Sequence, residues 1–437
     1  MLMLAAPIET VEKDAARAVK RAENMEIQTV TAETLSELLG LPGMKVRRLA
    51  MEAQGEEKHL HLFCEHEQAV AICPRCLEIV AGGYDHKDRS VRHLDIWGMR
   101  TVVHFPQRRF DCDTCSEPFT ENLAWLDPKR RQTQAFEAHI YQQVKHKTPR
   151  RQVALEAGLS ESTVLDIFKR QAKKRMQQPG EGRVRKLGVD EISLRKRHKQ
   201  YALVLSDLEG RRVLAVLPNR LKASFEQWLA GLTAKERQAI VVVSMDMWEG
   251  YRQAVHNKLP HARIVADRFH VMKQLNHQID LLRRALQRQA KKTGNETVYQ
   301  ALKGSRWLLL KRRCDLNPEE EAKLRLILDV SDELRSIYLL KAEFITICDK
   351  MRDRAQAKRF LRAWTRKAVA TGCRYLIRFV KTLQNWWHEF LNYFIDRVTQ
   401  GFVEGINRAI RGIINRAFGF RCFDNFRLQV LVECGGT

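Results

Sequence analysis

The sequence predicts a multidomain α/β protein, because of its length, a changing residue pattern and two Cys-x-x-Cys pairs. Its 437 residues suffice for roughly two to four domains. A composition of 44% hydrophobic and 29% charged residues is ordinary for globular protein and excludes wholesale disorder. Along the chain, short alternating runs are followed by a helical segment, then by mixed strands and helices, and finally by a long helical stretch.

The charge balance indicates the kind of partner. The chain has 76 Lys and Arg against 52 Asp and Glu, a net charge of +24. Such an excess favours a polyanion, with nucleic acid ahead of a membrane surface. No window approaches the roughly 18 apolar residues of a membrane span, and the N-terminus does not have the pattern of a signal peptide. We therefore expect a cytoplasmic or nucleoid-associated protein without a membrane partner.

Two Cys-x-x-Cys pairs lie within residues 45–126, a region of short strand patterns. Four thiolates in a tetrahedron form a closed structural Zn²⁺ site, which would hold together a ribbon too small to bury a good core. The alternative is a set of buried or redox-active thiols. The nearby Cys64, His61 and His66 are expected to be surface or packing residues. The four predicted ligands are Cys73, Cys76, Cys112 and Cys115.

Residues 148–170 fit two short helices joined by a tight turn. Gly158 permits a left-handed turn, and Ser160 is a good N-cap for the second helix. Residues 141–186 carry twelve basic and four acidic residues, and 12 − 4 gives a net charge of +8. The pattern predicts a DNA-binding helix-turn-helix whose second helix enters the major groove, although an ordinary helical hairpin has the same apolar spacing. The expected DNA contacts are Ser162, Thr163, Lys169 and Arg170.

From Leu187 onward, strand-like runs rich in Val, Leu and Ile alternate with helices in the order strand, strand, strand, helix, strand, helix, strand. This order implies an α/β core, and a ribonuclease H-like sheet would place the first and fourth strands side by side. Asp190 and Asp246 end those two strands and would face the same crevice. Adjacent carboxylates suit Mg²⁺, and two such ions could activate a water or a 3′ hydroxyl. Each aspartate taken alone could instead be a cap or turn residue.

A third acid is needed to complete such a site. Glu404 begins the last basic helix and is the preferred candidate. Asp267, which ends the fifth strand, competes with it, whereas Glu191 should point to the sheet face opposite Asp190. Residues that follow Glu404 on nearby turns could contact phosphates. They are Asn407, Arg408 and Arg411.

The stretch from Phe269 to about Asp396 has helical spacing throughout. Its tryptophans are expected to anchor helix packing, with stacking on unpaired bases as the alternative. These tryptophans are Trp307, Trp364, Trp386 and Trp387.

Several of these motifs together resemble the ISL3 family of insertion-sequence DDE transposases. The resemblance spans roughly residues 60–432 and includes the CPRC and FDCDTC knuckles and the helix-turn-helix RRQVALEAGLSESTV. It also includes three core blocks: GVDEISLRK; VSMDMWEGY with ADRFHV; and VEGINRAIRGIINRAFGFRCFDNFR. The last block is the most specific, because it is long and unusual.

The resemblance implies a fold, an activity and a set of site residues. Asp190, Asp246 and Glu404 would be the catalytic acids of a ribonuclease H-like domain interrupted by a helical insertion. They would hold two Mg²⁺ or Mn²⁺ ions. The family binds terminal inverted repeats and cuts and rejoins double-stranded DNA, so at least a dimer is expected in the active complex. Trp248 and Tyr251 match the block after the second aspartate, as core packing or as DNA contacts.

Two other functions explain part of the sequence. A zinc-ribbon and helix-turn-helix regulator without nuclease activity would explain the charge and both DNA-binding motifs, but not the three acids. A structure-specific nuclease or resolvase on the same fold is the other alternative. The expected segments are a leader of uncertain structure (1–44), a zinc-ribbon domain (45–126), a helix-turn-helix domain (127–177), a linker (178–186), the first part of the ribonuclease H-like core (187–268), a helical insertion (269–400) and the last part of the core (401–437).

Overall fold

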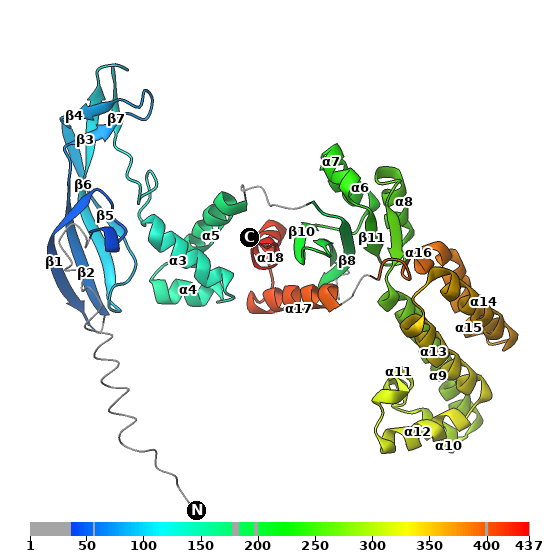
Figure 1. Ribbon diagram of the computed structural model, residues 1–437. Helices are drawn as coiled ribbons and strands as arrows, with labels where there is room; N and C mark the ends of the chain where they lie inside the picture. Colours follow the sequence, from blue (N-terminus) through cyan, green and yellow to red (C-terminus); the bar gives the residue numbers. More distant parts are fainter. Residues whose placement is uncertain (1–35, 56, 177–182, 196–199, 398–400, 437) are drawn as a thin grey trace, which may run out of the picture. The chain divides into compact units, whose positions relative to one another are not determined.

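A computed structural model describes residues 36–436, apart from residue 56 and residues 177–182, 196–199 and 398–400 (Figure 1). Most of the predicted leader and most of the predicted linker therefore lie outside the described residues. The chain divides into two compact units. The first contains the residues up to Val144 together with Val153–Gln171, and the second contains Lys145–Gln152 and the residues from Ala172 onward.

The first unit contains the predicted β domain, a sheet in the order β1-β2-β6-β5 with β7 added to β6. A separate hairpin, β3-β4, carries the first cysteine pair. Alternate residues of the main strands, such as Leu60, Leu62, Val103 and Phe105, are buried, as expected for strands with one solvated face. The bounds are β1 Met44–Gln54, β2 Glu57–His66, β3 Val70–Ile72, β4 Ile79–Ala81, β5 Asp85–Arg92, β6 Arg100–Cys112 and β7 Glu117–Thr120.

Three helices follow the β domain: α3 Gln134–Lys145, α4 Arg150–Ala157 and α5 Glu161–Met176. The apolar residues Val153, Ala154, Val164 and Ile167 are all buried, as the helix-turn-helix prediction requires. The ring of Tyr141 on α3 stacks on Phe168 of α5, with 5.6 Å between the ring centroids, so α3 and α5 pack against each other.

The second unit is built on a five-stranded sheet in the order β10-β9-β8-β11-β12. β8 is antiparallel to β9 and parallel to β11, and β11 is parallel to β12. The predicted ribonuclease H-like strand order is therefore confirmed, with the first and fourth strands of the core adjacent. The bounds are β8 Lys186–Arg195, β9 Gln200–Asp207, β10 Arg212–Leu217, β11 Val242–Met245 and β12 Arg263–Ala266.

Helices cover both faces of this sheet (Figure 1). On one face, Leu187 and Val189 pack with residues of α6 (Lys222–Gly231) and α8 (Glu249–Lys258). On the other face, Ile192 packs with residues of α17 (Gly401–Arg416) and α18 (Phe423–Cys434). The short α7 (Ala234–Ala239) precedes β11. Because strand neighbours alternate between faces, Asp190 lies on the α17 side and Glu191 on the α8 side.

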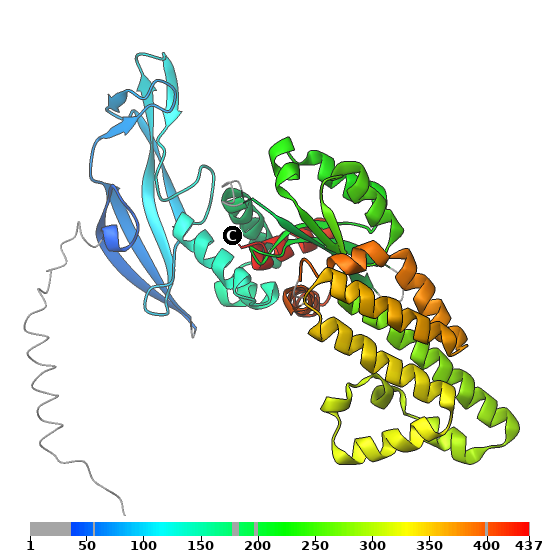
Figure 2. The same ribbon diagram turned by 45° about the vertical axis from the view of Figure 1, so that its right-hand side comes forward.

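The predicted insertion is helical (Figure 2), and its hydrophobic core continues into the sheet through Val242 of β11 and Val265 and Ala266 of β12. Trp364 is fully buried and its ring packs at 5.0 Å against Phe344, while Trp386 is also buried. The prediction that Trp307 anchors packing is wrong, because this residue is 67% exposed. The helices are α9 Arg268–Thr293, α10 Glu296–Leu302, α11 Arg306–Leu310, the 3₁₀ helix η2 Arg313–Asp315, α12 Pro318–Asp329, α13 Asp332–Lys350, α14 Arg354–Ala370, α15 Arg374–Asn385 and α16 Trp387–Asn392.

The last basic helix predicted from the sequence is α17, and a second helix, α18, follows it. α17 ends at Arg416, and the chain then turns through Phe418 and Gly419, both with positive φ. α18 was not predicted from the sequence. Within the part of the chain that the structure describes, no helix is both long and apolar enough to cross a bilayer.

Candidate functional site

Two aspartates lie at the same level on adjacent parallel strands. Met245, the last residue of β11, pairs with Val189 of β8, so the next residues, Asp246 and Asp190, lie side by side. Asp246 directly follows β11 as expected, but the expectation that Asp190 ends its strand is wrong, because β8 continues to Arg195. Asp190 Oδ1 accepts a hydrogen bond of 2.7 Å from its neighbour's backbone N–H, and Asp246 Oδ1 accepts one of 2.6 Å from Met247 N. Each carboxylate therefore has one oxygen fixed by the backbone.

His270, on the first turn of α9, lies between the acidic groups. Its Nδ1 is 3.1 Å from Asp246 Oδ2, and its Nε2 is 3.9 Å from Asp190 Oδ1. Asp267 Oδ2 is also near, at 3.8 Å from Nε2. Three carboxylates from β8, β11 and the end of β12 thus converge on one imidazole.

These contacts shift the pKa values in the directions expected for a charged cluster. Burial by itself would lower the pKa of His270, but the hydrogen bond and charge of Asp246 outweigh burial and raise it. Burial would raise the pKa of Asp246, but His270 lowers it below its usual value. Asp267 is different, because burial dominates and raises its pKa to about 6. The imidazole is therefore more easily protonated at this position, where carboxylates face one another, than it would be in water.

Asp267 also has a local structural role. Its Oδ1 accepts a hydrogen bond of 3.0 Å from Phe269 N and caps the N-terminus of α9. The sequence left open whether Asp267 is a ligand or a cap, and the structure shows it as a cap. The sequence analysis did not single out His270; the spacing of three residues from Asp267, which sets both side chains on one turn, was the signal that could have found it.

The structure does not bring Glu404 to the two aspartates. Its side chain, on the first turn of α17, is 75% exposed and pairs with Arg408 at 3.5 Å. Asn407, one turn further along, donates a hydrogen bond of 2.6 Å to Asp190 Oδ2. The expectation that Asn407 contacts DNA phosphates therefore needs correction, because its amide is directed at Asp190. Arg408 and Arg411 are both exposed.

The opposite face of β8 carries a separate network. Glu191 accepts hydrogen bonds from Tyr251 Oη at 2.9 Å and from Arg220 at 3.1 Å. Tyr251 is fully buried, and burial raises the pKa of its hydroxyl, so it is a core residue rather than a DNA contact. Trp248 packs edge-on against that ring at 4.4 Å and is 38% exposed. As predicted, Glu191 does not share a face with Asp190.

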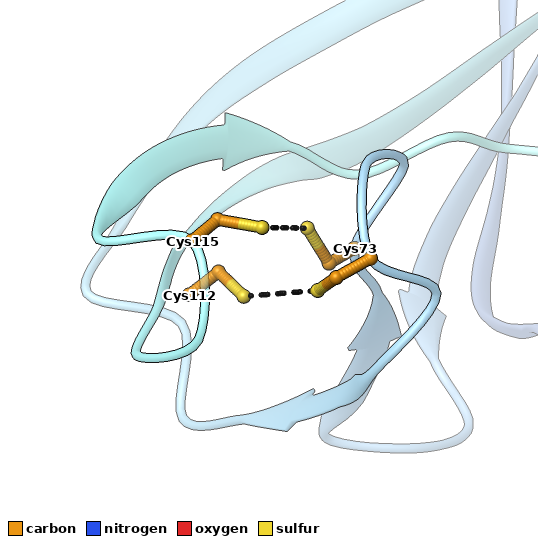
Figure 3. A group of neighbouring side chains, drawn as sticks. Cys73, Cys112 and Cys115 are labelled. Atoms are coloured by element: carbon orange, nitrogen blue, oxygen red, sulfur yellow. Dashed lines mark hydrogen bonds between the residues drawn. The ribbon is translucent and has the colours of Figure 1, made fainter.

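The four predicted zinc ligands form a cluster (Figure 3). Cys73 Sγ lies 3.9 Å from Cys115 Sγ, and Cys76 Sγ lies 3.5 Å from Cys112 Sγ. Zn–S bonds of about 2.3 Å in a tetrahedron place sulfurs about 3.8 Å apart, so the spacing fits zinc and excludes disulfides.

Both knuckles have the same backbone form, since the residue after each second cysteine, Leu77 or Ser116, has a positive φ. Backbone N–H groups of Cys76 and then Arg75 lower the pKa of Cys73 to about 6. Contact with the Cys76 thiol, followed by burial, raises the pKa of Cys115 to about 12. The four thiols therefore need a cation to deprotonate together. The nearby Cys64 is buried in the core of the main sheet, which agrees with its predicted packing role.

The turn between α4 and α5 has the predicted chemistry. Gly158 has a φ of +65°, and Ser160 Oγ accepts a hydrogen bond of 3.1 Å from Thr163 N. Ser160 Oγ also lies 2.8 Å from the hydroxyls of Ser162 and Thr163. These contacts fix the first turn of α5, the part of a recognition helix that meets base edges.

Comparison with known protein families decides which family this architecture represents. A family model described as a transposase matches residues 187–430, more than half of the chain. A model for the helix-turn-helix domain of ISL3-family transposases matches residues 121–172, and a zinc-finger model of the transposases of IS204, IS1001, IS1096 and IS1165 matches residues 69–115. The chain belongs to the ISL3 family of transposases. Its cysteine cluster is the zinc ribbon of that family, and α4 with α5 is its DNA-binding helix-turn-helix.

Individual transposases are similar over much of the chain. The transposase for insertion sequence element IS1001 of Bordetella parapertussis is 29% identical over 379 residues, which cover 86% of this chain and 92% of that protein. The transposase for IS1557 of Mycobacterium tuberculosis is 28% identical over 260 residues, which cover 54% of this chain and 57% of that protein.

The recognition helix of this transposase presents its predicted contact residues differently. Ser162 and Lys169 are exposed. Arg170 instead pairs at 2.5 Å with the buried Glu137 of α3, which also accepts a hydrogen bond of 3.1 Å from Gln171. Arg170 therefore joins α5 to α3. The sequence analysis instead expected Arg170 to be an exposed DNA contact.

Proposed function

We propose that this chain is the transposase of an insertion sequence that binds the element's terminal inverted repeats and catalyses metal-dependent DNA strand cleavage and strand transfer. The observation that carries the proposal is the pairing of β8 with β11, which sets Asp190 and Asp246 side by side on adjacent strands of a ribonuclease H-like sheet. A single aspartate on a strand is common, but two aspartates side by side on adjacent strands, with one imidazole between them, are suited to phosphoryl chemistry.

The donor set fits a divalent cation. Carboxylate oxygens are the ligands that Mg²⁺ and Mn²⁺ prefer. One oxygen of Asp246 and one of Asp190 already face the His270 imidazole, whose raised pKa marks a position that favours positive charge. Divalent ions held by Asp190, Asp246 and Glu404, two in the full complement, would supply an activated water or 3′ hydroxyl and charge stabilisation at a phosphodiester.

Other residues of the chain position these ligands. Asn407 holds Asp190 Oδ2, and the backbone N–H of Glu191 holds Oδ1, so both oxygens of this carboxylate are oriented. Glu404 lies three residues before Asn407 and therefore on the same side of α17, one turn away. We infer that the first turn of α17 moves toward β8 when the site is loaded, which would add Glu404 as the third carboxylate.

The DNA-binding elements would select the substrate. The first turn of α5, with Ser162 and Thr163, would contact base edges, and Lys169 would contact phosphates. Arg408 and Arg411 of α17 would contact phosphates beside the carboxylates. Two element ends must be joined, so the active complex would contain at least two copies of the chain. Because the substrate is chromosomal DNA, the transposase would act in the cytoplasm at the nucleoid.

The test is cleavage of a labelled duplex that carries the element's own terminal repeat, with Mg²⁺ present. Wild-type protein should nick the duplex, and Glu404→Gln should bind it without nicking. Specific binding without cleavage by either protein would favour a regulator. Equal cleavage by both would show that Glu404 is not the third acid.

A further inference from the structure

The helix pair α14–α15 of the insertion has an unusual charge. Residues 354–388 contain nine basic and no acidic residues, and 9 − 0 gives a net charge of +9. All nine side chains are exposed. The net charge per residue is therefore higher in this segment than in residues 141–186. The nine residues are Arg354, Lys358, Arg359, Arg362, Arg366, Lys367, Arg374, Arg378 and Lys381.

The charge is sorted within the insertion rather than spread over it. Residues 318–350, which form α12 and α13, contain five basic and eight acidic residues, and 5 − 8 gives a net charge of −3. α13 packs against α14, and α14 against α15 (Figures 1 and 2). A surface that only keeps a protein soluble mixes both signs, so this segregation indicates a binding surface for an anion.

Four of the cations form one row along α14. Arg354, Lys358, Arg362 and Arg366 follow one another at intervals of four residues, and we refer to them as the basic ridge. At 1.5 Å per residue the ridge is about 18 Å long, with about 6 Å between successive Cα atoms along the axis. The helix is fixed beneath the ridge by a buried face. That face contains Ala357, Leu361, Trp364 and Ala368.

The ridge is not neutralised by the protein itself. Lys367, next to Arg366, pairs with Glu343 of α13 at 2.8 Å. Among the residues that the structure describes, no carboxylate forms an ion pair with any member of the ridge. Like charges four residues apart destabilise a helix, so three successive pairs of this kind are unfavourable until an anion contacts them.

We propose that the basic ridge binds the sugar-phosphate backbone of duplex DNA, independently of sequence and in addition to the helix-turn-helix. This inference rests on the proposed function, in which the same chain handles element ends and target DNA. Regularly spaced cations on a rigid helix match a linear polyanion, because duplex DNA carries one charge per about 1.7 Å of its axis. The ridge presents no aromatic side chain that could read bases, so it positions DNA without selecting a sequence.

The test is the salt dependence of binding to a 30-base-pair duplex of random sequence without divalent ions. Each phosphate contact contributes about 0.9 to the slope of log K against log salt concentration, so four contacts contribute about 3.6. The variant Arg354→Gln/Lys358→Gln/Arg362→Gln/Arg366→Gln keeps good helix formers. Its slope should be lower than the wild-type slope by 3 to 4, so that between 50 and 200 mM salt the wild type loses about 150-fold more affinity than the variant.

A matched control removes the same number of charges from the same insertion. Arg312, Arg313, Arg325 and Arg335 each pair with an acid of α12, α13 or their flanking residues. Their replacement by Gln changes the net charge equally and should leave the slope within about 0.5 of wild type. An unchanged slope in the ridge variant, or an equal fall in both variants, would overturn the inference. Equal circular dichroism spectra and melting temperatures would show that both variants are folded.

The two proposals can fail separately. The slope is measured on DNA without element ends and without metal, so it requires no cleavage. A transposase that cleaves its terminal repeat but has an unchanged slope would contradict only the basic ridge. A chain whose slope falls as expected but which never cleaves would contradict only the proposed function.

Discussion

Replacement of His270 by Gln should expose the repulsion among the carboxylates around it. The imidazole makes one hydrogen bond of 3.1 Å to Asp246, and its ring lies 3.8 and 3.9 Å from Asp267 and Asp190. A hydrogen bond to a charged group contributes about 1.5–3 kcal/mol net. The two longer contacts add attraction that is partly offset by the cost of burying charge. We therefore expect His270→Gln to lower the stability of the second unit by about 2–3 kcal/mol, which is a fall of roughly 5–10 °C in Tm for a domain of this size.

The stability that His270 contributes should decrease as pH rises. The folded-state pKa of His270 is raised above 6.5, so its contribution to stability is complete below about pH 6.5 and is lost as pH rises through the folded pKa. The Tm values of the wild type and of His270→Gln should therefore differ most below about pH 6.5, and the difference should shrink as pH rises above that value. His256→Gln, the same change on the exposed side of α8, should have no such profile. An equal Tm for wild type and His270→Gln at every pH would refute the reasoning.

Two further predictions concern the zinc ribbon and the third acid. Cys112→Ser should reduce bound zinc from one ion per chain to nearly none and leave the ribbon sensitive to protease, because the metal supplies the folding energy of the ribbon. The control variant Cys314→Ser, which changes an exposed cysteine, should retain zinc. Metal analysis tests this, and a full complement of zinc in Cys112→Ser would contradict the site. Asp267→Asn should stabilise the fold by about 1–3 kcal/mol above pH 6, because the pKa of Asp267 is raised from 3.8 to about 6 and Asn caps α9 equally well. In denaturant titrations this gain in stability should vanish below about pH 4. The variant should still cleave DNA, and a loss of cleavage would make Asp267 the third acid.

Features that depend on local pattern were predictable from the sequence. Alternating apolar positions gave the strands of the first unit, and Gly158 with Ser160 gave the turn of the helix-turn-helix. The strand order of the core followed from the order of strand-like and helical runs. Because that order makes β8 and β11 neighbours, it also gave the proximity of Asp190 and Asp246. The zinc cluster followed from cysteine spacing alone.

Features that depend on how a helix is rotated about its axis, or on partners that are distant in the sequence, were not predictable. Helical spacing gave an exposed Arg170, but the buried Glu137 lies 33 residues earlier and attracts its guanidinium. Asn407 was assigned to DNA because it follows Glu404 in a basic helix, yet its partner Asp190 is 217 residues away. Trp307 was expected to be buried because large aromatic side chains usually are, but α11 has only five residues and turns this ring to solvent. The end of α17 depended on backbone angles at Phe418 and Gly419.

The most direct test of the central claim is the rate at which Asp246→Asn cleaves a terminal-repeat duplex in Mg²⁺. If Asp246 holds the ion, its loss removes several kcal/mol of transition-state stabilisation, which is a fall of about 100- to 1000-fold in rate. Asp246→Asn should still bind the duplex. The control variant Asp332→Asn, which changes an exposed acid of the insertion, should cleave at the wild-type rate. Cleavage by Asp246→Asn at the wild-type rate would contradict the assignment of Asp190 and Asp246 to a metal-dependent active site.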